Sequence, residues 1–204
     1  MSTGLDVVII DSGGANLASL RYALDRLGAR SAVSSDPALI GAAPRVLLPG
    51  VGAAADAMAR LRSHGLDRLI PQLRSPVLGI CLGMQLLFEH SAEGDTSCLG
   101  VIAGTVERLR SAPGLPVPHM GWNTLDLQRE DPLLSGIRNS DRLYFVHSFA
   151  APVNGCSLAS VHYGRAHCAI VRQRNFRGVQ FHPERSSAAG ARILRNFLAP
   201  GACY

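Results

Sequence analysis

The 204-residue chain contains no lysine, no paired cysteine motif and no long apolar run. Because no stretch approaches the roughly 18 apolar residues of a membrane-spanning helix, and no basic leader precedes an apolar run, we expect neither membrane insertion nor secretion. The five cysteines are odd in number, dispersed and free of C-x-x-C spacing, which favours reduced thiols in the cytoplasm over disulfides or a zinc site. Length and composition predict a single globular domain over residues 1–204.

The charge balance is weak evidence for nucleic-acid binding. All twenty basic residues are arginines and the formal net charge is +5, yet only Arg172, Arg174 and Arg177 form even a loose group. Aromatic residues make up 5% of the chain, too few for a base-stacking platform. We therefore expect the arginines to lie on solvated or partner-facing surfaces and expect no nucleic-acid partner.

In the first half of the chain, short apolar runs alternate with segments of helical period. Such alternation is typical of βαβ units and a parallel sheet. The expected strands are residues 7–10, 29–33, 45–48 and 77–80, and the expected helices are residues 17–27, 53–61 and 82–88.

Beyond Gly94 the pattern changes to short strands separated by turn residues, which predicts a more antiparallel region. The expected elements are strands at 105–109, 123–127, 143–149, 158–161, 169–171 and 179–181, followed by an amphipathic helix at 188–198.

Cys81 stands between Gly79 and Gly83 where an apolar strand is expected to turn into a helix. This spacing is the thiol counterpart of the G-x-S-x-G elbow, in which small neighbours let strand and helix pack around a projecting nucleophile. The positive end of a helix dipole also favours the reactive thiolate. The alternative is a small buried core residue, because unpaired cysteines are often buried.

Among the seven histidines, His182 alone combines a strand end with an acidic residue two positions later, Glu184. Both side chains can point to one side of an extended backbone, which Pro183 stiffens. A carboxylate beside an imidazole fixes its tautomer and stabilises its protonated form, as in a catalytic triad. No H-E-x-x-H motif accompanies these residues, so we expect no metal site.

Together, residues 79–85 and 179–184 resemble the class I glutamine amidotransferase family, and residues 49–52 match that family's oxyanion strand. The resemblance implies a doubly wound, mostly parallel central sheet flanked by helices, with an added antiparallel strand region in the second half. It also implies a Cys81–His182–Glu184 triad that hydrolyses L-glutamine to glutamate and ammonia without a cofactor. The backbone N–H groups of Val51 and Leu82 are the candidate oxyanion donors, with Gly50 and Gly52 beside them.

Within the family, residues 118–123 and 144–148 resemble the glutaminase subunits of imidazole glycerol phosphate synthase, an enzyme of histidine biosynthesis. This implies a heterodimer with a (β/α)8-barrel cyclase that receives ammonia through a channel and makes imidazole glycerol phosphate and the purine precursor AICAR. The implied contacts to that partner come from Asn16, His119, Met120, Trp122, Tyr144 and Arg185.

By the same resemblance, Gln85, Glu93, Ser148 and Phe149 would hold the glutamine. Gln85 and Glu93 have a simpler interpretation as the solvated face of the helix after Cys81, and Trp122 and Tyr144 have one as core aromatics. Ser12, Phe149 and Arg185 depart from the commonest family pattern, in which Tyr, Tyr and Lys are frequent.

Three functions remain open at this stage. The first is the glutaminase of the histidine pathway. The second is a glutaminase that serves another synthase or acts alone on γ-glutamyl compounds. The third is a non-catalytic binding module that keeps the fold. The glycines of residues 49–52 also permit a peptide flip, so we expect a partner-gated oxyanion donor.

Overall fold

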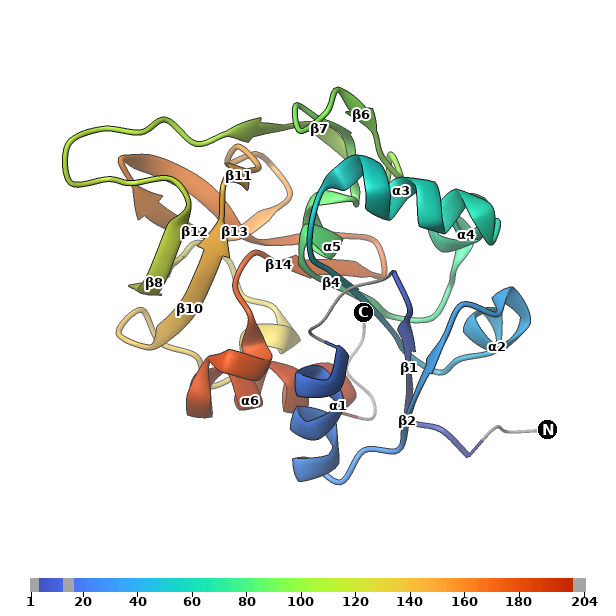
Figure 1. Ribbon diagram of the computed structural model, residues 1–204. Helices are drawn as coiled ribbons and strands as arrows, with labels where there is room; N and C mark the ends of the chain where they lie inside the picture. The colour runs from blue at the N-terminus through green and yellow to red at the C-terminus, as the bar shows by residue number, and fades with distance from the viewer. Residues whose placement is uncertain (1–3, 13–16, 200–204) are drawn as a thin grey trace.

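The computed structural model describes residues 4–12 and 17–199, and Figure 1 shows them built around one large twisted sheet. Its eight strands run in the order β2-β1-β3-β4-β14-β13-β12-β9. The first five are mutually parallel, and the last three continue the sheet in antiparallel pairing. Their bounds are β1 Val7–Ile10, β2 Ser31–Ser34, β3 Val46–Gly50, β4 Val77–Cys81, β9 Asp126–Leu127, β12 Ser157–Tyr163, β13 Arg165–Gln173 and β14 Phe176–Val179.

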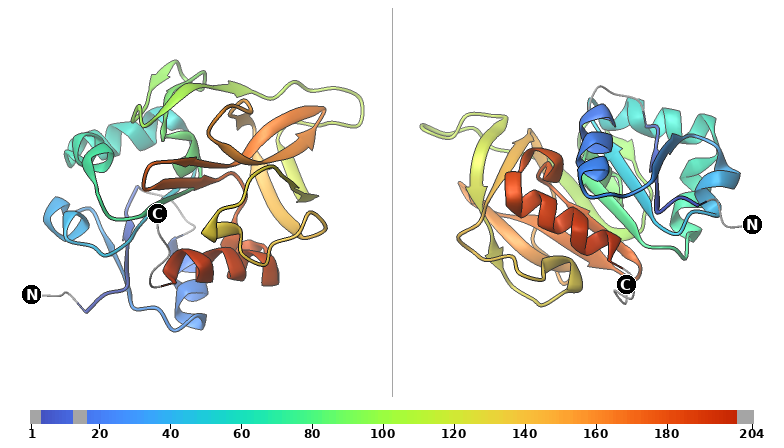
Figure 2. Two further views of the ribbon diagram at one scale, coloured as in Figure 1. Left: turned by 180° about the vertical axis from the view of Figure 1, so that it is seen from behind. Right: turned by 90° about the horizontal axis from the view of Figure 1, so that it is seen from below.

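Helices cover both faces of the parallel part, because successive strand residues point to opposite sides. Val8, Val46 and Leu48 belong to one core with α3 and α4, whereas Ile9 and Leu47 belong to the other with α1 and α6. Figures 1 and 2 show α1 and α6 side by side, away from α3 and α4. The helices are α1 Leu17–Arg26, α2 Pro37–Gly41, α3 Ala54–Ser63, α4 Leu66–Leu69, α5 Leu82–Gln85 and α6 Ser187–Leu198, with 3-10 turns η1 Ile70–Gln72, η2 Pro132–Leu134 and η3 Pro183–Arg185.

Two smaller sheets complete the second half of the chain. One is an antiparallel ribbon of β8 (His119–Thr124) and β10 (Arg142–His147). The other has the order β11-β7-β5-β6, from Phe149–Ala150, Ile102–Arg108, Phe88–Ser91 and Thr96–Ser97. The α/β fold with a mostly parallel sheet, flanking helices and an antiparallel second half is therefore confirmed. Within the described part of the chain, no helix has the length and apolar character needed to cross a membrane.

The expected helix over residues 82–88 is wrong beyond its first turn. Helix α5 ends at Gln85, and Phe88 begins a strand. The backbone carbonyl of Leu86 accepts the N–H of Leu99, and that of Leu87 accepts the N–H groups of Val101 and Ile102. These long-range partners replace helical hydrogen bonds, so tertiary pairing overrides the local helical pattern.

Other boundaries differ as well: β14 is Phe176–Val179 where residues 179–181 were expected, and β13 is Arg165–Gln173 where residues 169–171 were expected. The expected strands at 123–127 and 143–149 are each interrupted, giving β8 with β9 and β10 with β11, and the short helices α2 and α4 were not predicted.

Candidate active site

The carboxyl ends of β3, β4 and β14 meet at one edge of the sheet. The register pairs Gly50 with Cys81 and Val179 with Ile80, so the segments that follow these strands converge. In open parallel sheets this edge is the usual place for a ligand site. It brings together residues 50–52, Cys81 and His182.

Cys81 occupies a strained turn between β4 and α5, with a φ of 54°. A side chain in this region of backbone space costs on the order of 1–3 kcal/mol, which the surrounding packing must offset. A Cβ on Gly83 would lie 1.7 Å from the carbonyl oxygen of Leu48, and one on Gly79 would lie 2.7 Å from the carbonyl oxygen of Gly83. The two glycines are therefore required by close backbone contact, as the elbow spacing predicts.

The contribution of helix α5 to this site is smaller than expected. A macrodipole sums aligned peptide units, and α5 has only the four residues Leu82–Gln85. The sulfur of Cys81 instead contacts polar groups: it donates to the carbonyl oxygen of Val146 at 3.7 Å and accepts from the amide of Gln180 at 3.8 Å.

His182 and Glu184 form a buried pair beside this sulfur. The ring Nδ1 of His182 lies 2.8 Å from Oε1 of Glu184, and the two side chains are 6% and 1% exposed. Since an ionised carboxylate only accepts hydrogen bonds, Nδ1 carries a proton and Nε2 is left for the thiol. The main chain is fixed as well: the N–H of His182 donates to the carbonyl of Tyr144 at 2.9 Å, and the hydroxyl of Ser186 donates to the carbonyl of His182 at 2.7 Å.

The balance of interactions favours the charged ring. Burial lowers the pKa of His182, but hydrogen bonds with Cys81 and Glu184, together with their charges, outweigh it and raise the pKa well above 6.5. The group can therefore hold a proton taken from the thiol, which is the requirement for a thiolate nucleophile with a general acid beside it.

Cys81 and His182 open onto a pocket of about 520 Å³, whereas Glu184 contacts His182 and is not among the residues that line it. The pocket contains most of the expected site residues, and it adds Ser19, Pro118, Val146 and His147. Its lining residues are Ser19, Gly50, Val51, Gly52, Cys81, Leu82, Gln85, Glu93, Pro118, Val146, His147, Ser148, Phe149, His182 and Arg185.

Comparison with known proteins agrees with this geometry. The family described as glutamine amidotransferase class-I matches residues 8–200. The chain belongs to that family. It is 53% identical to the imidazole glycerol phosphate synthase subunit HisH of Xanthomonas campestris pv. campestris (strain 8004), over 95% of this chain and 96% of the relative, and equally identical over the same shares to the HisH of Xylella fastidiosa (strain Temecula1).

Solved amidotransferase structures share the fold of this class-I chain at much lower identity. A putative GMP synthase protein from Thermoplasma acidophilum superposes with a TM-score of 0.72 at 20% identity, covering 97% of this chain and 92% of its own. A structure titled glutamine amidotransferase gives 0.73 at 20%, covering 94% and 96%. These likenesses concern the fold alone.

Gln85 is buried within this amidotransferase pocket, at 4% exposure, which rules out its interpretation as a solvated helix face. Its amide donates to the carbonyl oxygen of Phe149 at 2.7 Å and to Oε1 of Gln180 at 2.9 Å. Gln180 in turn donates to the Cys81 sulfur, so it links the Gln85 side chain to the nucleophile. Gln180 was not among the residues predicted from the sequence, although it lies inside the 179–184 segment that carries the family resemblance.

Glu93 is half-buried and does not project freely into solvent. Its Oε2 accepts the backbone N–H of Ala54 at 2.9 Å. Ser148 and Phe149 also line the pocket, and the carbonyl oxygen of Phe149 accepts the hydrogen bond from the Gln85 amide.

His147, which itself lines the pocket, forms a hydrogen-bonded pair with the buried His119. Nδ1 of His147 is 2.8 Å from the carbonyl oxygen of Phe149, so it must be the protonated nitrogen, and Nε2 must accept. His119 Nδ1 lies 3.0 Å from that Nε2 and therefore donates to it, and His119 Nε2 accepts from Asn123 at 3.3 Å. The bonds run in one direction, from Asn123 through both rings to the Phe149 carbonyl.

Both of these rings are held neutral. Burial is the main cause that lowers the pKa of His147 to about 3, outweighing the Phe149 hydrogen bond that raises it. Burial, followed by the charge of His167, lowers the pKa of His119 to about 4. Neutral rings fit a positioning role and not proton transfer near pH 7.

The residues expected at a partner interface separate into two groups. Met120 and Trp122 are 66% and 48% exposed, and the ring of Tyr144, which is half-buried, lies edge-on to Trp122 at 5.8 Å. Trp122 is therefore no core aromatic. Arg185 is exposed at the pocket, whereas His119 is 4% exposed and offers almost no side-chain surface. Asn16 lies outside the described residues.

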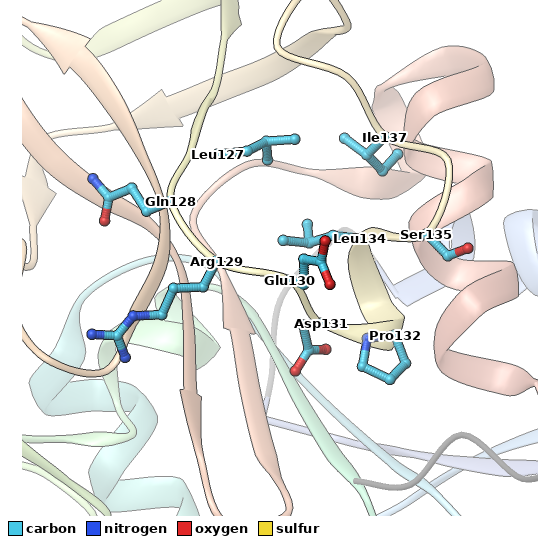
Figure 3. Close-up of a pocket in the computed structure, with 9 residues that line it drawn as sticks. All are labelled: Leu127, Gln128, Arg129, Glu130, Asp131, Pro132, Leu134, Ser135 and Ile137. Atoms are coloured by element: carbon cyan, nitrogen blue, oxygen red, sulfur yellow. The ribbon is translucent and has the colours of Figure 1, made fainter.

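A larger hollow of about 660 Å³ lies elsewhere, and Figure 3 shows it between residues 127 and 137. None of the candidate catalytic residues lines it. The Asp131 carboxylate there already accepts from Arg172, Arg177 and the N–H of Leu133. Volume alone therefore does not identify the amidotransferase site.

Proposed function

We propose that this chain is the glutaminase subunit of an imidazole glycerol phosphate synthase, acting in histidine biosynthesis. The observation that carries the proposal is that the buried Cys81 and His182 line one pocket, while the buried Glu184 carboxylate bonds to Nδ1 of His182. The relatives named as HisH, at 53% identity over almost the full length of both chains, support the choice of synthase.

The reaction begins when His182 Nε2 takes the thiol proton and the Cys81 sulfur adds to the amide carbon of glutamine. The carbonyl oxygen becomes an oxyanion, for which the N–H groups of Val51 and Leu82 are the proposed donors, with Gly50 and Gly52 allowing their approach. The charged His182 ring then protonates the departing nitrogen. Ammonia and a glutamyl thioester result.

The same ring next accepts a proton from water, which attacks the thioester, and returns it to the sulfur as glutamate leaves. Glu184 stabilises the charged ring in both halves of the cycle. Overall, one glutamine and one water give one glutamate and one ammonia. In this scheme Gln85, Glu93, Ser148 and Phe149 hold the amino-acid end of glutamine.

Ammonia released into water would be protonated and lose its nucleophilicity, so its delivery requires a protected path. We place the mouth of this path beside the exposed Met120 and Trp122, with Tyr144 and Arg185 at its rim. Aromatic residues, Met and Arg are enriched in interface cores. The proposed partner is a (β/α)8-barrel cyclase subunit in a cytoplasmic heterodimer, to which Asn16 also contributes by resemblance.

We further propose that residues 1–204 act as one amidotransferase domain, since strands from both halves of the chain, β1 to β4 and β9 and β12 to β14, share one sheet. Partner binding would gate the reaction by turning the Val51 N–H toward the oxyanion.

The decisive test uses the Cys81→Ala variant mixed with an imidazole glycerol phosphate synthase barrel. We expect glutamine-dependent product formation to fall by about 10⁴-fold or more, as for loss of a triad nucleophile, while turnover with added ammonium salt persists. Cys98→Ala, which removes a thiol outside the pocket, is the matched control. Retained glutamine use by Cys81→Ala would refute the assigned nucleophile, and full glutaminase activity without any barrel would favour a stand-alone hydrolase or another synthase.

A further inference from the structure

We propose that Ser12 and Glu93 clamp the two ends of the turn formed by residues 50–53, and that Glu93 thereby links glutamine binding to the geometry of the oxyanion donor. Both are positioning residues in this role. The inference rests on the proposed glutaminase function and adds to it a physical connection between the substrate's amino end and the reacting carbonyl.

The first end of the turn is fixed by Ser12. Strand β1 pairs with β3 only at Val46 and Leu47, so the carbonyl of Pro49 lies beyond the last main-chain partner on that side. The Ser12 hydroxyl donates to this carbonyl at 2.6 Å and is itself 3% exposed. Beyond the end of β1, the buried Ser12 hydroxyl thus supplies one further hydrogen bond to β3.

Close packing extends this fixed region to Gly50. A Cβ at Gly50 would lie 2.9 Å from the backbone nitrogen of Gly83 and 2.9 Å from Cβ of Leu82. The backbone of Gly50 therefore packs directly against the first residues of α5, which restricts its movement. The turn that can rotate therefore begins after Gly50, and Gly52 within it has a φ of +86°.

The second end of the turn is fixed by Glu93. Helix α3 begins at Ala54, and its N-cap residue is Ala53, whose side chain cannot accept a hydrogen bond. Helix starts usually use Ser, Thr, Asp or Asn to satisfy their free N–H groups. Here the acceptor comes from a distant segment: Glu93 Oε2 binds the Ala54 N–H at 2.9 Å.

Glu93 is itself held in place. Its carbonyl oxygen accepts from the Thr96 hydroxyl at 2.7 Å, and its N–H donates to the Ser91 hydroxyl at 3.2 Å. Its carboxylate lines the same pocket as Cys81, and among the described residues no hydrogen bond reaches its second oxygen, Oε1. One carboxylate can therefore bind the ammonium group of glutamine and the end of the oxyanion turn at once.

Two substitutions separate these two roles. Glu93→Gln keeps a carbonyl oxygen for the Ala54 N–H but loses the charge that attracts an ammonium group, whereas Glu93→Ala loses both. With glutamine and the barrel complex, we expect both variants to raise KM about tenfold or more. Only Glu93→Ala should also lower kcat, by about tenfold, which is less than the 10²–10³-fold expected for complete loss of an oxyanion donor.

A substrate without an amino group isolates the clamp. p-Nitrophenyl acetate acylates a thiolate through a tetrahedral oxyanion, releases p-nitrophenolate and regenerates the thiol when water hydrolyses the thioester. We expect wild type and Glu93→Gln to react at similar rates, and Glu93→Ala and Ser12→Ala to react about tenfold more slowly. Alkylation of Cys81 by iodoacetamide needs no oxyanion hole and should be unchanged in the folded variants.

Equal ester rates in Glu93→Gln and Glu93→Ala, with a normal rate in Ser12→Ala, would overturn the clamp. Ser12→Ala tests the opposite end of the turn independently if Glu93→Ala does not fold. Absence of glutamine turnover in the wild-type complex would instead refute the proposed function, because the ester ratios do not depend on glutamine.

Discussion

His182 and His147 line the same pocket and are buried to a similar degree, at 5% and 6% exposure, yet their surroundings move their pKa values in opposite directions. His182 faces a carboxylate and a thiol, and its pKa rises. His147 faces a backbone carbonyl and a second imidazole, and its pKa falls to about 3. Burial disfavours the charged form of both rings, so the charge of the partner decides the outcome.

The two histidines therefore mark two sides of the pocket. The side around His182 takes part in proton transfer, and the side around His147 holds other groups in position. The His182 side can store a proton between two steps of a reaction. The His147 side can only donate and accept hydrogen bonds in a fixed direction, from Asn123 through His119 to the Phe149 carbonyl. Exposed Met120 and Trp122 lie on the same strand as His119, so this neutral chain also connects the proposed partner surface to the pocket wall.

The substitution expected to reduce the difference between the two histidines most is Glu184→Gln, which gives His182 a neutral partner like that of His147. The amide oxygen can still accept the Nδ1 proton, but the stabilising charge is lost, so we expect the pKa of His182 to fall. Glutamine kcat/KM should decrease by about 10²–10⁴-fold, as when the acid of a triad is replaced by its amide. The pH profile of kcat/KM and an NMR titration of the ring would measure both effects.

Glu107→Gln serves as the control for that experiment, since Glu107 is exposed and forms a surface salt bridge with Arg165, away from the pocket lining. Ammonium-dependent turnover of the complex should be unaffected by either change. An unaltered His182 titration in Glu184→Gln, or a loss of less than about threefold in kcat/KM, would contradict the assigned role.

A smaller effect is expected from changes at His147, where two substitutions retain different halves of the ring. Asn places its N–H group near Nδ1 and keeps the donor to Phe149, whereas Gln reaches the Nε2 position and keeps a partner for His119. Loss of the hydrogen bond to Phe149 should cost about 1 kcal/mol, or about fivefold in kcat/KM. We therefore expect His147→Gln to be slower than His147→Asn in glutaminase assays, and equal losses would show that the Phe149 bond has no role in positioning.

The residues Cys81, His182 and Glu184 were predictable because the sequence patterns that mark them are local. The glycines around Cys81 and the carboxylate two positions after His182 are each visible within a few residues, and the parallel register of β3, β4 and β14 then brings them together. The supporting contacts were not predictable in this way. Neither the His119–His147 bond nor the contact of Gln180 with Cys81 has a sequence pattern, because each depends on how separate strands meet.

The length of helix α5 was also not predictable from local sequence. Its apolar pattern predicts several turns, but the carbonyls of Leu86 and Leu87 find partners in residues 99–102, which no local rule reveals. Strand β8 is an intermediate case. Its alternation of side chains would have indicated that His119 and Met120 face opposite ways, so the burial of His119 was within reach of the sequence.

The smallest predicted effect concerns stability against pH, where the two histidine environments should act on opposite sides of neutrality. The folded-state pKa of His147 is lowered, so above pH 6.5 its neutral form contributes fully. As pH falls below 6.5 the unfolded chain binds a proton that the folded chain refuses, and stability is lost toward pH 3. His182 has a raised pKa, so its contribution is complete below 6.5 and is lost as pH rises through the higher folded value.

Urea unfolding of wild type and His147→Asn at about pH 6.5 and pH 5 would measure the acid side. We expect the variant to lose about 1.5 kcal/mol less stability over this interval, because one fewer neutral imidazole is buried. Glu184→Gln should leave the acid side unchanged and flatten the profile above pH 6.5. Parallel profiles for all three proteins would mean that the two rings titrate alike in the folded state, and the distinction between a proton-storing side and a neutral side of the pocket would then be wrong.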